Sequence, residues 1–386
     1  MIYLDYASAT PVSEKAIRAM QPYFSEKFFN PSAPYLAAKR VREDYEAAKS
    51  ELAHIIGAKG DDLIITAGAT EANNLAFSAL DVIKTEHENP QVLVLETEHA
   101  SVLELGKKYQ AELIKVDHTG LIDLVDLKRK LTGNTAFVSV ALANNEIGTI
   151  QPLAEIAEII RKERETRLIT GNPIPLIFHS DASQALSLIP ISVARLGVDL
   201  MTLNSAKVYG PKGVGALYQG HQVRLQPISA GGGQEKGLRS GTENVPGLIG
   251  FATAAIEAKA HQNGARKRYE SMAKILKAEL EKSPVAPVFL GNKKHQLANF
   301  CPVSFPGIDA ERIIYLLEEE EIYLSTGAAC AASKGVKSHV LKAIGLNDAE
   351  IAGSLRISLG LQNTADDMAV AGQRIVAAIS KELARY

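Results

Sequence analysis

Two side chains in the middle of the chain have the chemistry that an imine-forming enzyme needs. Lys207 lies between an apolar run and a glycine-rich turn, in DLMTLNSAKVYGPKG over residues 199–213. The apolar run 175–178 leads into Asp181, so we expect a carboxylate at a neighbouring strand end, where open α/β sheets bind ligands. A lysine can hold an aldehyde as an imine, and a carboxylate can keep a pyridine nitrogen protonated. The pair therefore predicts an enzyme that uses pyridoxal 5'-phosphate.

A phosphate-binding turn is predicted in TAGATEANN, residues 66–74. Small residues there stand between a strand and a helix, and the amides of a helix start bind phosphate. Ala69 and Thr70 would supply the amides, and the Thr70 hydroxyl could add a hydrogen bond. The alternative is a plain strand-to-helix turn in which Thr70 caps the helix.

Two further polar side chains follow strands and could reach the same sheet edge. His99, in LETEHAS, could stack on a cofactor ring and move protons near neutral pH, or it could be structural. Asn144 and Asn145 precede Gly148 in ALANNEIGT. Asn145 could bind the ring hydroxyl of the cofactor, unless the two asparagines only form a turn.

Three later segments carry candidate ligand contacts. Gln184 could face the same ligand, or be a surface amide. The glycine-rich segment 231–246 contains Arg239 and Thr242, which suit an anion contact, although a mobile surface loop has a similar composition. Arg356 stands in the apolar run SLRISLG and needs a partner, either a substrate carboxylate or a side chain in a buried ion pair.

The chain has two cysteines with different surroundings. Cys330, in STGAACAASKGVKSHVL, follows a short predicted strand within a run of small residues. An accessible thiol there could become a nucleophilic thiolate. Cys301 alternates with apolar neighbours in NFCPVSF and is expected to be a small core residue.

The elements that must position these residues alternate along the chain. The expected strands are 63–66, 92–95, 137–142, 177–179 and 200–203, and the expected helices include 42–56 and 153–163. This alternation is typical of an α/β fold with a mostly parallel sheet between helices. A long helix from about 259 to 280 and short strands near 288, 298–305, 322–325 and 355–359 indicate a smaller α+β domain. We expect the large domain over 14–258, and the small domain over 1–13 and 259–386 with the cysteine loop at about 325–341.

Composition excludes several classes of protein. The 386 residues contain 42 lysines and arginines against 44 acidic residues, so net charge gives no attraction to nucleic acid or to anionic membranes. Two cysteines form no disulfide framework and fit a reducing compartment. The start MIYLDYASAT has no leader pattern, and no apolar run is long enough to span a membrane. We expect a cytoplasmic enzyme without a metal site.

Taken together, the segments resemble the cysteine desulfurases of the NifS/IscS type, within the class V, fold-type I pyridoxal-phosphate enzymes. The resemblance covers almost the whole chain, from LDYASATP to SLRISLG. Between these ends, eight segments follow the family's order: FFNPSAP, TAGATEANNLA, ETEHASV, NNEIGTIQPL, HSDASQ, KVYGPKGVGALY, GGGQEKGLRSGTENVPG and STGAACAAS. The resemblance implies a seven-stranded, mostly parallel sheet in the large domain.

The resemblance also implies a role for each candidate residue. Lys207 would form the imine, Asp181 would face the pyridine nitrogen, and His99 would stack on the ring. The remaining cofactor contacts implied are Asn145, Gln184, Ala69, Thr70 and, on the partner's cofactor in a homodimer, Thr242. Arg356, with Asn145, would bind the substrate carboxylate, and Cys330 would attack the sulfur of L-cysteine to give L-alanine and a persulfide.

The chain departs from the family pattern next to the lysine. Asn204 and Ala206 stand where the family usually has a phosphate-binding serine and a histidine, and Ser205 could supply a displaced hydroxyl. The segment from Cys330 to Leu341 resembles the longer loop of the NifS/IscS branch rather than the SufS loop.

The implied sulfur acceptors are an iron–sulfur scaffold protein or a tRNA-thiolation carrier. Alternatives are a selenocysteine lyase or another class V aminotransferase-like enzyme, which would not need Cys330 as a sulfur acceptor, and a noncatalytic binding protein that keeps the fold.

Overall fold

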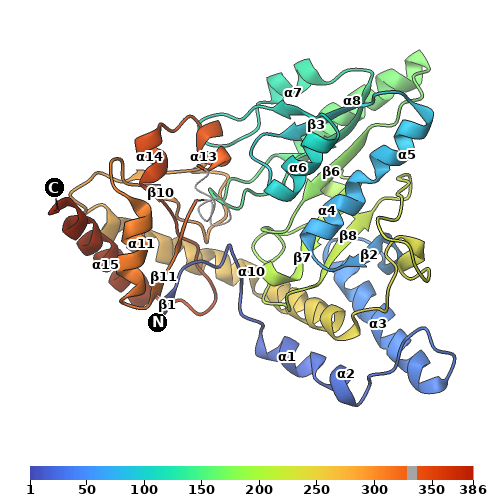
Figure 1. Cartoon of the computed structure of the whole chain (residues 1–386), viewed down its shortest axis with the longest axis horizontal. Coiled ribbons are helices and arrows are strands. Elements are labelled where there is room, and N and C mark those ends of the chain that lie inside the picture. Colours follow the sequence, from blue (N-terminus) through green and yellow to red (C-terminus); the bar gives the residue numbers. More distant parts are fainter. Residues whose placement is uncertain (328–336, 386) are drawn as a thin grey trace.

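A seven-stranded sheet forms the centre of the larger part of the molecule in the computed structural model, which describes residues 1–327 and 337–385 (Figure 1). Its strand order is β2 (Leu63–Thr66), β8 (Gly215–Gln219), β7 (Leu200–Asn204), β6 (Ile177–Asp181), β5 (Thr135–Ser139), β3 (Gln91–Leu95) and β4 (Glu112–Ile114). Only β8 runs antiparallel to its neighbours within this sheet. The predicted α/β fold with a mostly parallel seven-stranded sheet is confirmed.

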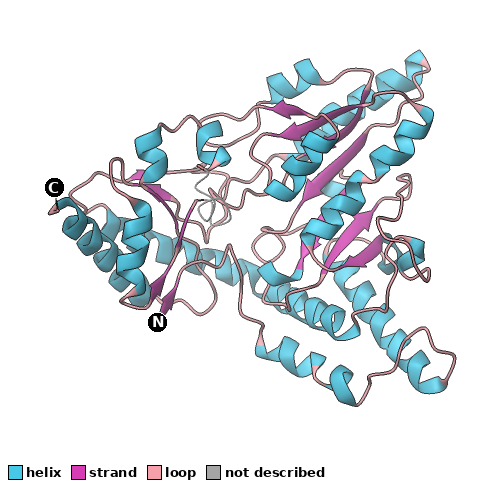
Figure 2. Cartoon of the chain, viewed as in Figure 1, coloured by secondary structure: helices cyan, strands magenta, loops and turns pink. Residues whose placement is uncertain are grey.

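Helices cover both faces of this sheet because successive strand residues point to opposite sides. In β2, Leu63 and Ile65 belong to one hydrophobic cluster, and Ile64 belongs to another. The first cluster includes residues of α3 (Leu36–Ile55), α8 (Leu153–Thr170) and the first half of α10 (Val245–Leu280). The second includes residues of α4 (Ala69–Phe77), α5 (Ala79–Glu86) and α6 (Ala100–Lys108). Figure 2 shows the sheet between these helices.

A smaller unit contains both ends of the chain (Figure 1). Its antiparallel sheet has the order β12 (Ser325–Thr326), β13 (Ser354–Arg356), β10 (Val303–Ser304) and β9 (Val288–Phe289). Beside it, β1 (Ile2–Tyr3) pairs in parallel with β11 (Ile322–Tyr323). A separate hydrophobic cluster joins these strands to α11 (Ala310–Glu318), α15 (Ala365–Leu383) and the second half of α10.

Shorter elements connect and flank the two units. They are α1 (Glu14–Met20), α2 (Pro22–Ser25), α7 (Leu124–Lys130), α9 (Val193–Leu196), α13 (His339–Ala343) and α14 (Asp348–Ala352), with the 3-10 turns η1 (Gly60–Asp62), η2 (Ser205–Lys207) and η3 (Glu235–Gly237). No helix in the described ranges combines the length and apolar character that a membrane crossing requires.

The two units share one long helix. The sequence pattern places a domain boundary between residues 258 and 259. In the structure, α10 is one helix of 36 residues that runs across this boundary. At 1.5 Å per residue such a helix is about 54 Å long. We propose that the two units are the two expected domains and that α10 belongs to both.

Several elements differ from their predicted bounds. β2 has the predicted range, whereas α3 begins at Leu36, earlier than expected. The strand expected over 298–305 is only two residues long, at β10. β4 and β8 were not expected, because β4 is short and partly exposed and β8 follows a glycine-rich turn that masks its apolar run.

Candidate active site

A large cavity lies at the carboxyl edge of the seven-stranded sheet, between the two units. Its volume is 1140 Å³, and polar residues that follow β2, β3, β6 and β7 line it. The smaller unit contributes Gly327, His339 and Arg356, while the N-terminal segment contributes Ala7 and Ser8. The parallel strands therefore bring most of the predicted site residues together, as the strand-end argument requires.

Lys207 enters this cavity from a single helical turn. β7 ends at Asn204, whose side chain accepts a hydrogen bond from the Ala206 N–H at 3.2 Å and so caps η2. The Lys207 Nζ donates to the carbonyls of Ala7 at 2.8 Å and Ser8 at 2.5 Å. The amine is thus fixed at the cavity wall against the N-terminal segment.

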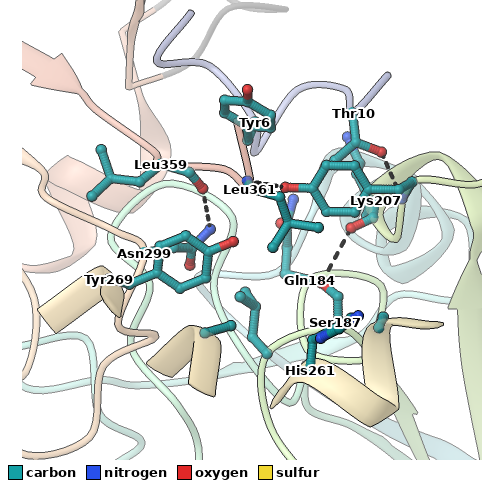
Figure 3. Close-up of a pocket in the computed structure, with 14 residues that line it drawn as sticks. Tyr6, Thr10, Gln184, Ser187, Lys207, His261, Tyr269, Asn299, Leu359 and Leu361 are labelled. Atoms are coloured by element: carbon teal, nitrogen blue, oxygen red, sulfur yellow. Dashed lines mark hydrogen bonds between the residues drawn. The ribbon is translucent and has the colours of Figure 1, made fainter. Parts of the chain in front are cut away.

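A second, much smaller cavity lies beside Lys207 and Gln184, which line both cavities. Its volume of 20 Å³ is about that needed for one water molecule. Figure 3 shows Tyr6, Tyr269 and Gln184 around it, with the Ser187 hydroxyl 3.4 Å from the Lys207 carbonyl. The backbone next to the lysine is therefore packed against α10 as well as against the sheet.

Asp181 is buried at the end of β6, with 7% of its surface exposed. Its Oδ1 accepts from the Ser183 N–H and its Oδ2 accepts from Asn73 Nδ2, each at 2.9 Å. These contacts fix a carboxylate that also lines the cavity.

The start of α4 provides an anion-binding arrangement. Ala69 and Thr70 form its first turn and line the cavity. Gly68, at the cap position, has a positive φ of 151° and provides no side-chain cap. The amides of this turn are therefore oriented for an anion, as a helix start favours.

His99 caps α6 and faces the cavity. Its Nδ1 accepts from the Ser101 N–H at 3.1 Å and lies 2.8 Å from Ser101 Oγ. Desolvation by the surrounding protein lowers the pKa of His99; Asp181 opposes this effect and the Lys207 charge adds to it. The imidazole is therefore biased toward its neutral form.

The two asparagines after β5 have different functions. Asn144 is buried and forms the turn, since its Oδ1 accepts from the Glu146 and Ile147 N–H groups. Asn145 lines the cavity. Gln184 also lines it and donates to the Ala7 carbonyl at 2.9 Å.

Arg356 is buried on β13 with a network of partners. Its Nη2 donates to Asp5 Oδ1 at 2.8 Å and to Ser8 Oγ at 2.5 Å, and its Nη1 donates to the Asn145 carbonyl at 3.1 Å. Within the described residues its Nε has no hydrogen-bond partner. The buried ion pair left open by the sequence is present, and the Nε–H is a buried donor that could bind a ligand.

Two predicted cofactor contacts lie outside the large cavity. Ser205 is fully buried, and its hydroxyl lies so close to Gly210 that a Cβ added to that glycine would be 2.2 Å from it. Ser205 does not line the large cavity, and its hydroxyl has no hydrogen-bond partner among the described residues, so its displaced-hydroxyl role stays a prediction. Thr242 lines a separate cavity of 110 Å³ together with Arg239 and Glu235.

The loop that carries Thr242 is anchored by a buried carboxylate. Glu235 Oε2 accepts from Lys49 Nζ at 2.7 Å and from the Ile65 N–H at 2.9 Å, while Oε1 accepts from the Tyr45 hydroxyl at 2.6 Å. Glu235 and Lys236 both have positive φ values, 46° and 59°, which cost non-glycine residues free energy. The anchor holds this backbone against the sheet.

Cys330 lies outside the described residues. On either side of that segment, Gly327 and His339 line the cavity, and Ser338 Oγ donates to Glu146 Oε2 at 2.5 Å. The other cysteine, Cys301, is fully buried, and burial raises the pKa of its thiol to about 11. The prediction that Cys301 is a core residue is confirmed.

Two buried carboxyl groups in the cavity wall were missed. Burial raises the pKa of Glu98 to about 8, with repulsion from Asp181 adding to the effect. Burial likewise raises the pKa of Glu146 to about 7, against the lowering effects of Ser338 and Arg356. Each stands next to a residue that was selected, so a search for every titratable group at the strand ends would have found them.

These groups fit pyridoxal 5'-phosphate. Lys207 offers an amine for its aldehyde, the buried Asp181 a carboxylate for its ring nitrogen, and the start of α4 amides for its phosphate. The cavity is also larger than the 300–1,000 Å³ that is about the usual range for small-molecule sites, which leaves room for a substrate.

The chain is similar to known proteins over nearly its full length. Residues 2–370 match the family Aminotransferase class-V. The curated protein Cysteine desulfurase IscS 1 of Archaeoglobus fulgidus is 40% identical, with 95% of this chain and 94% of that protein covered. Cysteine desulfurase IscS of Dictyoglomus turgidum is 36% identical, with 95% of this chain and 91% of that protein covered.

Solved structures give the same result. A NifS-like protein superposes with a TM-score of 0.89 at 30% identity, covering 98% of this chain and 99% of that one. SspA in complex with cysteine superposes with a TM-score of 0.79 at 29% identity, covering 93% and 99%. The chain therefore belongs to the class-V aminotransferase family and, within it, to the cysteine desulfurases of the NifS/IscS type.

Proposed function

We propose that this protein is a cysteine desulfurase that converts L-cysteine to L-alanine and leaves the sulfur as a persulfide on Cys330. The observation that carries the proposal is the meeting of Lys207, Asp181 and Arg356 in one cavity. Gly327 and His339, which lie before and after Cys330 in the sequence, both line this cavity. The relatives named above as cysteine desulfurases support the same activity.

The proposed cofactor is pyridoxal 5'-phosphate, which fits the groups that line the large cavity. Lys207 would hold its aldehyde and Asp181 its ring nitrogen, while His99 would stack on the ring. Its other contacts would be Ala69, Thr70, Asn145, Gln184 and Asn204, all of which line the cavity. When bound, the cofactor withdraws electrons from the substrate Cα and so labilises the bonds around it.

The substrate carboxylate would bind to Arg356 and Asn145. The guanidinium is held in place by Asp5, Ser8 and the Asn145 carbonyl, so its orientation is set before substrate arrives. The buried Nε, without a partner in the described residues, is the donor that a carboxylate would satisfy. This contact orients the Cα–H and C–S bonds in the cavity.

Two side chains can move the protons that the reaction needs. The lowered pKa of His99 keeps its imidazole neutral near pH 7, in a form that can take part in proton transfer. Lys207, once it releases the cofactor, is an amine at the same wall of the cavity. We assign proton removal and return at the substrate carbons to these two residues.

The Cys330 thiolate is the nucleophile that would take the sulfur from the substrate. It attacks the substrate sulfur, so an S–S bond forms while the C–S bond breaks. The electron pair of the C–S bond passes to the substrate, whose Cβ takes up a proton and becomes the methyl group of alanine. The thiol sulfur is oxidised and the substrate carbon is reduced, and no external oxidant is needed.

The active form is proposed to be a homodimer in the cytoplasm. Thr242 lies on an anchored loop outside the large cavity of its own chain, which fits a contact to the cofactor phosphate of the partner. The persulfide would pass to an iron–sulfur scaffold protein or to a tRNA-thiolation carrier.

The deciding experiment measures L-alanine release from L-cysteine and traps a persulfide by mass spectrometry, in wild type and in Cys330→Ala. A thiol reductant serves as the final sulfur acceptor in the alanine assay and is omitted from the reaction in which the persulfide is trapped. Alanine and a Cys330 persulfide that both disappear in the variant support sulfur transfer through Cys330. Alanine release that persists in the variant, also tested with L-selenocysteine, identifies a lyase instead. A wild type that binds cofactor but releases no alanine rejects the proposal.

A further inference from the structure

A path of hydrogen bonds connects Asp181 to His99 through two side chains that have no assigned function above. Asn73, on α4, donates from Nδ2 to Asp181 Oδ2 at 2.9 Å and to Ser101 Oγ at 2.9 Å. Ser101, on α6, contacts His99 Nδ1 through Oγ at 2.8 Å and through its N–H at 3.1 Å. The path therefore joins the end of β6 to the middle of α4 and the start of α6.

Which group donates in each of these hydrogen bonds follows from the atoms that can donate and the atoms that can accept. A carboxylate oxygen accepts, so the NH₂ group of Asn73 must face Asp181, and a flipped amide would place two oxygens in contact. The same NH₂ group donates to Ser101 Oγ. The Ser101 hydroxyl therefore accepts from Asn73. Because the Ser101 N–H donates to His99 Nδ1, that nitrogen is an acceptor, and the hydroxyl 2.8 Å away directs its own hydrogen to it.

His99 Nδ1 thus receives two hydrogens, one from the Ser101 hydroxyl and one from the Ser101 N–H. A ring nitrogen that accepts cannot carry a proton itself, so the neutral imidazole has its proton on Nε2. The surroundings also lower the pKa of His99, which favours this neutral form.

The burial of Asn73 shows that its amide is committed to these contacts. Asn73 is 0% exposed, and its Oδ1 has no hydrogen-bond partner among the residues that the structure describes. Burying an amide is costly unless hydrogen bonds offset it. The stabilising hydrogen bonds that this side chain makes in the described structure are the two donations to Asp181 and Ser101.

We propose that Asn73 and Ser101 are positioning residues that hold neutral His99 in its Nε2-protonated tautomer and couple its orientation to Asp181. The proposal rests on the proposed function, in which His99 stacks on the cofactor and moves protons. The tautomer decides which nitrogen can donate and which can accept, and a small rotation of the ring changes its overlap with the cofactor. Asn73 and Ser101 act through His99 and Asp181 and do not touch the reacting atoms.

The test is ¹⁵N NMR of histidine-labelled holoenzyme without substrate, with the His99 signals assigned by their loss in His99→Gln. In wild type, we expect a protonated Nε2 and an unprotonated Nδ1. Ser101→Ala keeps the main-chain N–H but removes the hydroxyl, so the other tautomer should become populated; Asn73→Ala should have the same effect by freeing the hydroxyl. Ser101→Thr restores the hydroxyl and should restore the wild-type signals.

Kinetics give a second readout on the same variants. Loss of one neutral hydrogen bond corresponds to a decrease in kcat of about fivefold to tenfold, with KM for L-cysteine nearly unchanged and the pH profile of kcat shifted. Ser380→Ala removes an exposed hydroxyl on α15 that donates to the Val376 carbonyl and should match wild type in all measurements.

Wild-type tautomer signals and wild-type kinetics in both alanine variants would overturn the positioning proposal. Failure of the proposed function gives a different result, because wild type would then release no alanine while the tautomer of His99 would still be measurable.

Discussion

Arg356 donates from Nη2 to Asp5 Oδ1 at 2.8 Å, so the guanidinium proposed to bind the substrate is held by a carboxylate from the start of the chain. Arg356 has 5% and Asp5 17% of its side chain exposed. A buried cation without its counterion is strongly destabilising. Asp5 therefore stabilises the Arg356 guanidinium before a substrate binds.

Replacement of Asp5 should make stability depend on the ligand. Asp5→Asn removes the counterion of Arg356 and should lower the free energy of unfolding by about 3 kcal/mol. A ligand carboxylate can replace the lost charge, so L-alanine should raise the Tm of Asp5→Asn more than that of wild type. Glu14→Gln, which affects an exposed pair with Arg18, is the control. Equal Tm shifts in all three proteins would contradict the prediction.

Replacement of Lys207 should abolish covalent attachment of the cofactor. Borohydride reduction of wild type should add the cofactor mass to the peptide that contains Lys207, whereas Lys207→Ala should give no such adduct and no L-alanine. Lys212→Ala is a matched control, since Lys212 donates to the Thr10 carbonyl at 2.8 Å and does not line the large cavity. An adduct that persists in Lys207→Ala and disappears in Lys212→Ala would move the imine to the other lysine.

Glu98 should make stability decrease as the pH rises. Burial raises its pKa to about 8 in the folded protein, while the unfolded carboxyl ionises near about 4.3. Between these values the folded state binds more protons than the unfolded state, so the stability present below the unfolded pKa is lost as pH rises through the folded pKa.

Glu98→Gln cannot ionise and should gain stability relative to wild type across that pH window. Each pKa unit corresponds to about 1.4 kcal/mol, so the gain should reach a few kcal/mol between about pH 5 and about pH 9, measured by denaturant unfolding. Glu104→Gln, at an exposed position, should show no such trend. A constant difference between Glu98→Gln and wild type over the whole range would contradict the assignment.

Loss of the Glu235 anchor should be costly because three donors depend on it. Lys49 and Glu235 have 6% and 5% of their side chains exposed. Glu235→Ala leaves the Lys49 ammonium buried without its carboxylate and should destabilise the protein by about 3–5 kcal/mol. Glu46→Ala breaks an exposed pair with Arg42 and should cost less than about 1 kcal/mol. Similar Tm values for the two variants would show that the anchor does not stabilise the fold.

Mixed dimers should test whether Thr242 serves the partner's site. If it does, a dimer of one Thr242→Ala chain and one Lys207→Ala chain contains one complete site, made from Lys207 of the first chain and Thr242 of the second. Mixing the inactive Lys207→Ala chain with the impaired Thr242→Ala chain should then restore up to about half of the wild-type activity per dimer. No recovery, with mixed dimers confirmed by native mass spectrometry, would place Thr242 outside the partner's site.

The ends of the strands in the large sheet could be predicted because each is marked in the sequence by an apolar run followed by polar residues. Apolar strands followed by Asp181, His99 and Lys207 must meet at one edge once the strands are parallel. The register of the sheet is not needed for that inference. β8 escaped prediction because its antiparallel position depends on pairing with β2 and β7, which no local pattern specifies.

Contacts that depend on long-range pairing could not be predicted. Asp5 and Ser8 reach Arg356 because β1 pairs with β11 and places the N-terminal segment beside β13. The orientation of Ser205 was also undetermined, since it depends on the single turn η2 that Asn204 caps. For Asn144 and Asn145, the sequence identified the turn, and the hydrogen bonds of Asn144 decided which side chain forms it.

The pairing of β1 with β11 has a consequence for the order of events during synthesis. Ile2 aligns with Ile322 and Tyr3 aligns with Tyr323, so β1 is synthesised long before the strand with which it pairs. The large sheet needs no residue beyond β8 and can form first. Translation therefore separates the two halves of the cavity in time: the wall that holds Lys207 and Asp181 can exist before the wall that holds Arg356 has been synthesised.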